Sequence, residues 1–155
     1  MKAQLIGQVF IYVITIVIVS FILLLGYNAI SSFNEKANQV SFLQFKNDLQ
    51  NTVESLSFDF GSVKIRNFVL PDNIKLVCLV KNFPNMPSLS GTDYPIIENS
   101  VNSGVNKNVF LISQNIEESF YIENIDLSED LFCKPVVGSE IKFKIEGLGD
   151  HALLS

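Results

Sequence analysis

An uncharged apolar run near the N-terminus constrains this chain more than any other feature. From Leu5 to Ile30 no residue carries a charge, and Val9–Leu25 contains only two polar side chains, Thr15 and Ser20. As an α-helix, the run from Leu5 to Ile30 would be roughly 39 Å long at about 1.5 Å per residue. The hydrocarbon core of a bilayer is about 30 Å thick. The run therefore predicts a helix that crosses a membrane.

Two other interpretations of this run fit less well. A buried core helix needs a domain large enough to surround it, and the remaining residues are too few. A cleaved secretory signal has an apolar region of about 7–15 residues followed by small residues at the cleavage site. Here the run is longer, and Tyr27 stands where a small residue would be needed for cleavage after Ala29. We expect the helix to be retained.

The charges on either side of the run predict its orientation. Lys2 is the only charged side chain before Glu35. The positive-inside rule then keeps residues 1–4 in the cytoplasm, with residues 5–30 spanning the cell membrane as a single pass and the rest extracytoplasmic. The chain has a net charge of −5 and no run of basic residues. This argues against nucleic acid as a partner, because phosphates need clustered Lys and Arg.

A helical pattern continues beyond the membrane, over residues 31–60. Phe33, Ala37 and Val40 recur at helical spacing, and so do five further residues, which are Phe42, Phe45, Leu49, Val53 and Leu56. No proline occurs before Pro71, so nothing forces the helix to stop at the membrane surface. We interpret residues 31–60 as an amphipathic stalk helix whose apolar side needs a covering partner.

Residues 61–155 change to a period of two, which is typical of strands. Ile141, Phe143 and Ile145 alternate with charged residues, as in a half-buried strand, and Gly147–Asp150 predicts a turn. The full set of expected strands is Val63–Leu70, Ile74–Val80, Asn108–Ser113, Ser119–Ile125, Ile141–Ile145 and Ala152–Leu154. The predicted fold is therefore α+β: a long N-terminal helix, transmembrane and then amphipathic, followed by a small antiparallel β domain.

The segment 82–107 follows neither periodicity. It is rich in Pro, Gly, Ser and Asn, and a connection of this length is unusual in a compact domain. Two interpretations remain open, a mobile loop or a surface loop that contacts a partner. We favour the mobile loop.

Cys78 and Cys133 are the only cysteines, and both belong to the predicted outer domain. An even cysteine count in an oxidising compartment predicts a disulfide, which would stabilise the domain by roughly 4 kcal/mol in the chain-entropy model. The alternative is two buried free thiols. A zinc site is not expected, because four ligands are needed and His151 is the single histidine.

No catalytic constellation emerges from the sequence. His151 lies beside Asp150, but adjacent residues on a strand point to opposite faces, so we expect an exposed turn histidine. The pairs of acidic residues do not match a calcium-binding loop. We therefore expect no enzyme activity, no cofactor, no metal and no small-molecule substrate.

The opening residues Met1-Lys2-Ala3-Gln4 lead directly into the apolar helix. This arrangement resembles the class III leader of archaeal type IV pilin-like proteins, in which a basic and a small residue precede a cleavage point commonly followed by Gln. The resemblance implies processing between Ala3 and Gln4 with retention of the apolar helix. The opening of this chain has one Lys rather than several, and Ala rather than the more usual Gly. An uncleaved signal anchor is the alternative.

These observations predict a pilin-like or membrane-tethered structural surface protein. Its partners would be membrane lipid around the N-terminal helix and further copies of the chain, in a homo-oligomer or pilin-like assembly. The alternative is a monomeric, membrane-anchored extracytoplasmic binding module that recognises a partner through the segment 82–107.

Replacing Val17, near the middle of the apolar run, with Arg should impair membrane insertion. A charge at mid-membrane costs about 2.5–3.5 kcal/mol on insertion scales. Fractionation of cells that express Val17→Arg should move protein out of the membrane fraction, whereas Val17→Leu should stay in it. An unchanged distribution for Val17→Arg would argue against a membrane-spanning helix.

Overall fold

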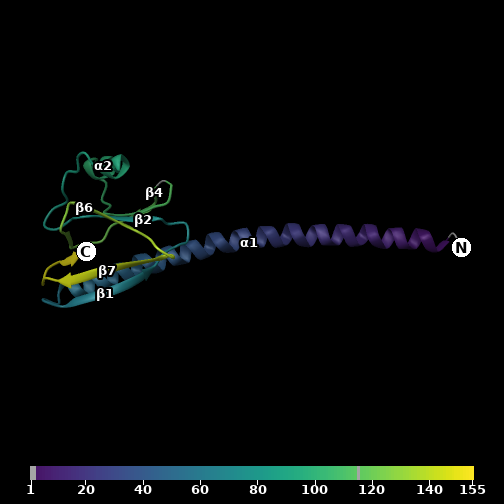
Figure 1. The fold of residues 1–155 in the computed structure, drawn as a ribbon, viewed down its shortest axis with the longest axis horizontal. Coiled ribbons are helices and arrows are strands. Elements are labelled where there is room, and N and C mark those ends of the chain that lie inside the picture. Colours follow the sequence, from purple (N-terminus) through teal and green to yellow (C-terminus); the bar gives the residue numbers. More distant parts are fainter. Residues whose placement is uncertain (1–2, 115) are drawn as a thin grey trace. The chain divides into compact units, whose positions relative to one another are not determined.

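The computed structural model describes residues 3–114 and 116–155 and confirms the α+β fold class. The chain divides into two compact units, Met1–Asn38 and Gln39–Ser155. The first unit is helical. The second contains two four-stranded sheets and two helical segments (Figure 1). One α-helix, α1 (Ala3–Ser57), contributes residues to both units.

Helix α1 ends three residues earlier than the predicted stalk, at Ser57, because strand β7 (Glu140–Gly147) approaches its last turn. Gly149 N–H donates to the Ser57 carbonyl at 2.8 Å. A Cβ at Gly147 would lie only 2.0 Å from the Leu56 carbonyl oxygen, so no other residue fits there without a shift. The close approach satisfies a carbonyl that the helix end would otherwise leave free.

The eight strands form two sheets. The first has the order β1-β7-β8-β5 and the second β4-β3-β2-β6. All pairs are antiparallel except β5 with β8, which are parallel. Besides β7, the strands are β1 (Val63–Val69), β2 (Leu76–Val80), β3 (Val109–Ile112), β4 (Ile116–Phe120), β5 (Ile125–Leu127), β6 (Leu131–Pro135) and β8 (Ala152–Leu154).

The C-terminal part of α1 packs into one core shared by both sheets. Its buried stripe consists of Phe45, Leu49, Val53 and Leu56, spaced to lie on one side of a helix. The ring of Phe45 meets Phe68 of β1 and Phe120 of β4 edge-on, each at a centroid distance of 6.0 Å. This part of the predicted apolar face is therefore covered within the chain.

The N-terminal part of the predicted apolar face, before Phe42, is exposed. At about 100° per residue, the helix makes about two and a half turns between Val40 and Leu49. The two side chains therefore point to opposite sides of the helix, and Val40 points away from the buried stripe. Phe33 and Val40 are both exposed, and so is Leu43. The predicted single stripe was therefore wrong, because two apolar sets occupy different sides of one helix.

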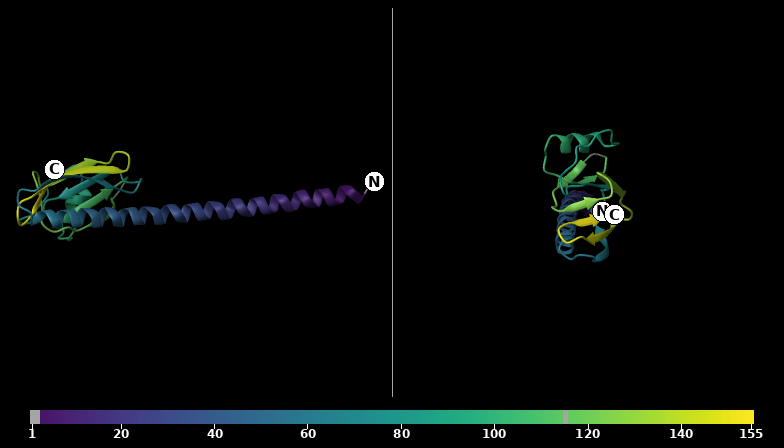
Figure 2. Two further views of the ribbon diagram at one scale, coloured as in Figure 1. Left: turned by 90° about the horizontal axis from the view of Figure 1, so that it is seen from below. Right: turned by 90° about the vertical axis from the view of Figure 1, so that its left-hand side faces the viewer.

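A second core lies on the other face of the second sheet, beneath α2 (Pro95–Asn102). Ile97 and Val101 of this helix pack on Cys78, Val80 and Phe110. Figures 1 and 2 both show α2 beyond the second sheet, on the side away from β1 and β7. Our preference for a mobile loop over 82–107 was wrong in this respect, since the segment forms a helix with its own buried contacts.

Two asparagines explain why the expected strand Ser119–Ile125 is broken into β4 and β5. Asn108 is fully buried, donates to the Ile122 carbonyl at 2.9 Å and accepts from Ile122 N–H at 2.8 Å. Asn82 donates to the same carbonyl at 2.6 Å and accepts from Ile125 N–H at 2.7 Å. These side chains take up backbone groups that a continuous strand would have paired with a neighbouring strand.

Truncating Phe45 to Ala should destabilise the second unit by about 3–5 kcal/mol, because a buried aromatic ring is lost and a cavity is left. Thermal unfolding of the full chain in detergent micelles, followed by circular dichroism, measures the change. Val40→Ala is the matched control: it removes an exposed apolar side chain from the same helix and should leave the midpoint nearly unchanged. Equal effects of the two variants would contradict the core position of Phe45.

Candidate functional site

The most distinctive functional feature is the apolar part of α1. Gln8–Tyr27 has a mean hydropathy of 3.0, is long and apolar enough to cross a membrane, and has no part buried by the rest of the structure. Its two aliphatic hydroxyls bond back to the helix: Thr15 Oγ1 donates to the Ile11 carbonyl and Ser20 Oγ to the Ile16 carbonyl, both at 2.8 Å. Over this stretch the helix thus offers a largely apolar surface, on which the hydroxyls of Thr15 and Ser20 are satisfied within the helix.

Two residues of the predicted leader lie at the start of α1. Lys2 is outside the residues that the structure describes, whereas Ala3 and Gln4 are the first residues of the helix. Their processing stays a prediction.

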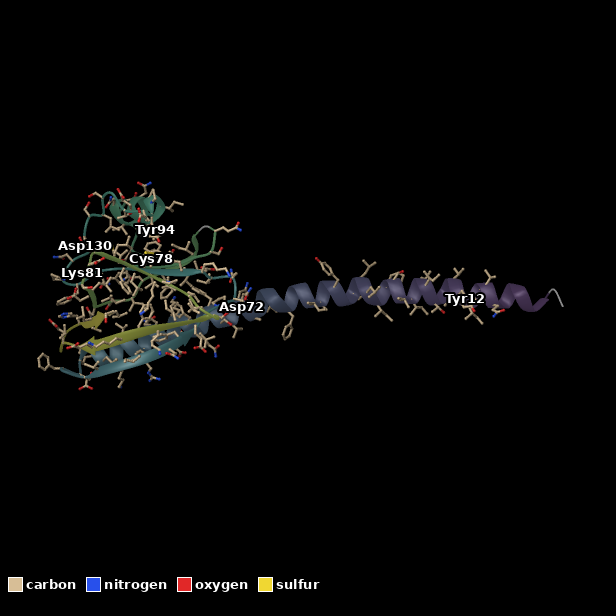
Figure 3. All side chains as sticks on the ribbon, viewed as in Figure 1. Tyr12, Asp72, Cys78, Lys81, Tyr94 and Asp130 are labelled. Carbon is tan, nitrogen blue, oxygen red and sulfur yellow. A yellow bond between two sulfur atoms is a disulfide. The ribbon has the colours of Figure 1, made fainter. Side chains whose placement is uncertain are left out.

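The predicted disulfide joins Cys78 to Cys133 across β2 and β6. The hydrogen bonds Lys81 N–H to Asp130 O and Val136 N–H to Lys75 O set the ladder so that the cysteines face each other as a non-hydrogen-bonded pair. Such pairs bring Cα atoms close together, and here they are 4.1 Å apart. Figure 3 labels Cys78 within the second unit.

One detail of the expected cysteine environment was wrong. On the expected strand Ile74–Val80, a period of two places Cys78 on one buried face together with Ile74 and Val80. Val80 does lie with Cys78 in the second core, but Ile74 precedes β2 and belongs to the first core. The period of two fails there because Ile74 is in a turn, where its N–H donates to the Pro71 carbonyl.

A polar cluster around His151 was missed by sequence reasoning. The His151 ring stacks on Phe83 at a centroid distance of 3.9 Å, and its side chain is only 14% exposed. Its Nδ1 contacts Asp150, and its Nε2 lies 3.6 Å from Asp126, which also pairs with Lys81 at 2.8 Å. The expectation of an exposed turn histidine was therefore wrong. No local motif could have revealed these contacts, because they join segments that are distant in the sequence.

The contacts of this cluster are structural: they join segments that are separate in the sequence. Both carboxylate oxygens of Asp126 already face a cation or the His151 ring, and Phe83 covers one face of that ring. The contacts attach β5 and β8 to the segment that follows β2. Among the described residues, no group of three or more His, Cys, Asp and Glu side chains converges as a metal site.

The surface of the second unit is shallowly hollowed beside α2. A hollow of about 260 Å³ is lined by seven residues, Asp93, Tyr94, Pro95, Ile96, Ile97, Ile112 and Gln114. Ile96 is exposed at its rim. The hollow offers mainly apolar contacts and has room for a side chain rather than for a large substrate.

Comparisons of the chain with protein-family models, curated proteins and solved structures find no match.

Alkylation of the native, full-length protein without reductant should label neither Cys78 nor Cys133, and reduction should expose both to labelling. Replacing both with Ala should lower the free energy of unfolding by about 4 kcal/mol, because the unfolded chain loses a cross-link between residues 55 apart. Mass spectrometry and thermal unfolding measure the two effects. Labelling of both thiols in unreduced protein would contradict the disulfide.

Proposed function

We propose that this protein is a membrane-anchored structural subunit of the cell surface that acts by assembly with further copies. The unburied apolar helix Gln8–Tyr27 carries this proposal. Apolar residues of this kind contribute about −0.3 to −0.6 kcal/mol each to membrane insertion, so the whole helix gains several kcal/mol by leaving water. Lipid, or the same helix of other copies, supplies the apolar environment that it needs.

The proposed orientation places the second unit outside the cytoplasm. The Cys78–Cys133 disulfide supports this, because structural disulfides persist in oxidising compartments. Lys2, the one charged residue before the apolar run, supports a cytoplasmic N-terminus by the positive-inside rule.

The exposed apolar residues beyond the membrane support assembly rather than simple tethering. Phe33, Val40 and Leu43 are exposed on α1, and Ala37–Phe45 contains no charged residue. In a bundle of copies these side chains would be covered by neighbouring helices, so the helix contact would extend past the bilayer. A pilin-like subunit processed between Ala3 and Gln4 is the specific form of assembly that we propose.

A monomeric, membrane-anchored binding module is the second candidate. The ordered segment 82–107 favours it, since α2 and its core hold the hollow beside Tyr94 and Ile96 in a defined shape. A partner side chain could enter this hollow without any contact between copies.

Two measurements on protein from native membranes separate these functions. N-terminal sequencing should find Gln4 as the first residue. Ala3→Phe should leave Met1 in place because a bulky residue replaces the small one at the cleavage point, and Ala3→Gly should still be processed. An intact Met1 in the unmodified protein would contradict the pilin-like form.

Photo-crosslinking tests assembly itself. Benzoylphenylalanine at Val40 should give dimers and larger products of the full chain in membranes, whereas the same group at Asp72, exposed after β1, is the control for random collision. Equal yields at the two positions would contradict assembly through α1 and favour the monomeric module.

A further inference from the structure

The two sheets end in four edge strands, β1 and β5 in the first and β4 and β6 in the second. An edge strand presents unpaired N–H and C=O groups to solvent, and proteins normally block such edges against pairing with another chain. The four edge strands of this protein differ in how they are protected from pairing with another chain.

Three of the edges carry a blocking group. The carbonyl of Ile125 in β5 accepts from the N–H groups of Asn82 and Phe83 at 3.0 and 3.1 Å. In β4, Lys107 Nζ donates to the Ser119 carbonyl at 3.0 Å. Strand β6 ends in Pro135, which has no N–H to offer. Each device lowers the capacity of its edge to accept another strand.

Strand β1 has no comparable device among the described residues. The bonds Leu70 N–H to Ser139 O and Gly147 N–H to Ser62 O set the ladder with β7 so that even-numbered residues of β1 bond to β7. The backbone groups of Val63, Ile65, Asn67 and Val69 consequently point away from β7. They are spaced to pair with one further strand.

The side chains of the same residues leave this edge apolar. Val63, Ile65 and Val69 are 50%, 65% and 59% exposed, although valine and isoleucine on a strand are usually half-covered by a neighbour. A strand added at this edge would cover them.

The charges around β1 specify the partner. Lys64 and Arg66 are exposed on β1, which contains no acidic residue. The paired strand β7 carries two lysines and two glutamates, Lys142, Lys144, Glu140 and Glu146, and Lys144 has Glu146 at 3.5 Å. The local excess of positive charge therefore comes from Lys64 and Arg66 of β1, and it contrasts with the net charge of −5 of the whole chain.

The same charges disfavour a second copy of β1 as the occupant. Antiparallel self-pairing must place outward-bonding residues of the two copies opposite each other. Whether Ile65 then faces Ile65, Asn67 or Val69 of the other copy, Arg66 lies opposite or diagonal to a cation. Like charges at these positions are destabilising. The other edges of a second copy are blocked.

We propose that β1 is the docking edge for an extended acidic segment of another protein, which adds a fifth strand to the sheet β1-β7-β8-β5. The segment would carry apolar side chains opposite Ile65 and Val69 and acidic side chains opposite Lys64 and Arg66, in alternation. Backbone hydrogen bonds supply general affinity, and the alternating side chains supply selectivity. This inference depends on the second unit alone and is independent of assembly through α1.

The test uses the full chain in detergent micelles and a fluorescein-labelled peptide of alternating Glu and Val, as long as β1. Fluorescence anisotropy should show saturable binding. A matched peptide with Lys in place of Glu should bind with an affinity lower by about tenfold or more, because its lysines meet Lys64 and Arg66 with like charge.

Two protein variants locate the binding edge. Ile65→Pro removes one outward N–H without removing a bond to β7 and should weaken binding about tenfold, whereas Ile65→Thr keeps the N–H and should retain most of it. The double variant Lys64→Glu, Arg66→Glu should reverse the preference between the two peptides.

Three results would overturn the proposal. The first is no binding of the Glu–Val peptide, and the second is equal binding of both peptides by the unmodified protein. The third is self-association, measured by analytical ultracentrifugation, that Ile65→Pro abolishes and the acidic peptide does not displace, since this would make a second copy the occupant.

Discussion

The packing of the last turns of α1 against both sheets is the contact on which the second unit depends. Phe45, Leu49, Val53 and Leu56 contribute to the same core as strands from each sheet. Without this stripe the two sheets would lack the element that fills the space between them. The aromatic contacts of Phe45 with Phe68 and Phe120 show the consequence directly, since one helix side chain touches a strand of each sheet.

The same helix meets a different requirement over Gln8–Tyr27, where none of the residues that the structure describes covers its apolar side chains. One continuous element thus serves as a core helix at its C-terminal end and as a membrane anchor, in our proposal, near its N-terminal end. Anchoring and folding are linked through the covalent chain rather than through a separate linker domain.

The second unit is held together by local contacts that differ from one part of the sheets to another. The buried Asn108 and the half-buried Asn82 organise the segment between β4 and β5, a disulfide joins β2 to β6, and the His151 cluster attaches β5 and β8 to the segment after β2. Against this background, the open and basic edge at β1 is an exception. An exposed apolar edge carries an aggregation risk, so its presence is better explained by a contact than by stability.

Much of this architecture was predictable from local patterns in the sequence. The charge-free run predicted the apolar helix, and the alternation of Ile141, Phe143 and Ile145 predicted β7, because burial on one side imposes the period of the element itself. The turn before Ala152–Leu154 and the pairing of the two cysteines also followed from the sequence. Strand β6 and helix α2 did not, since neither has a strong period of its own.

The sequence by itself determined that an apolar helix leads into a helix-and-strand unit with two cysteines, because these properties depend on neighbours along the chain. Only the tertiary structure decided which side of α1 is covered, where Asn108 is buried, what His151 contacts and which sheet edge stays open. Each of these depends on residues brought together from distant parts of the chain. The exposed side of Val40 illustrates the difference: its spacing marks an apolar residue on a helix, but the side that is buried was set by the strands that pack there.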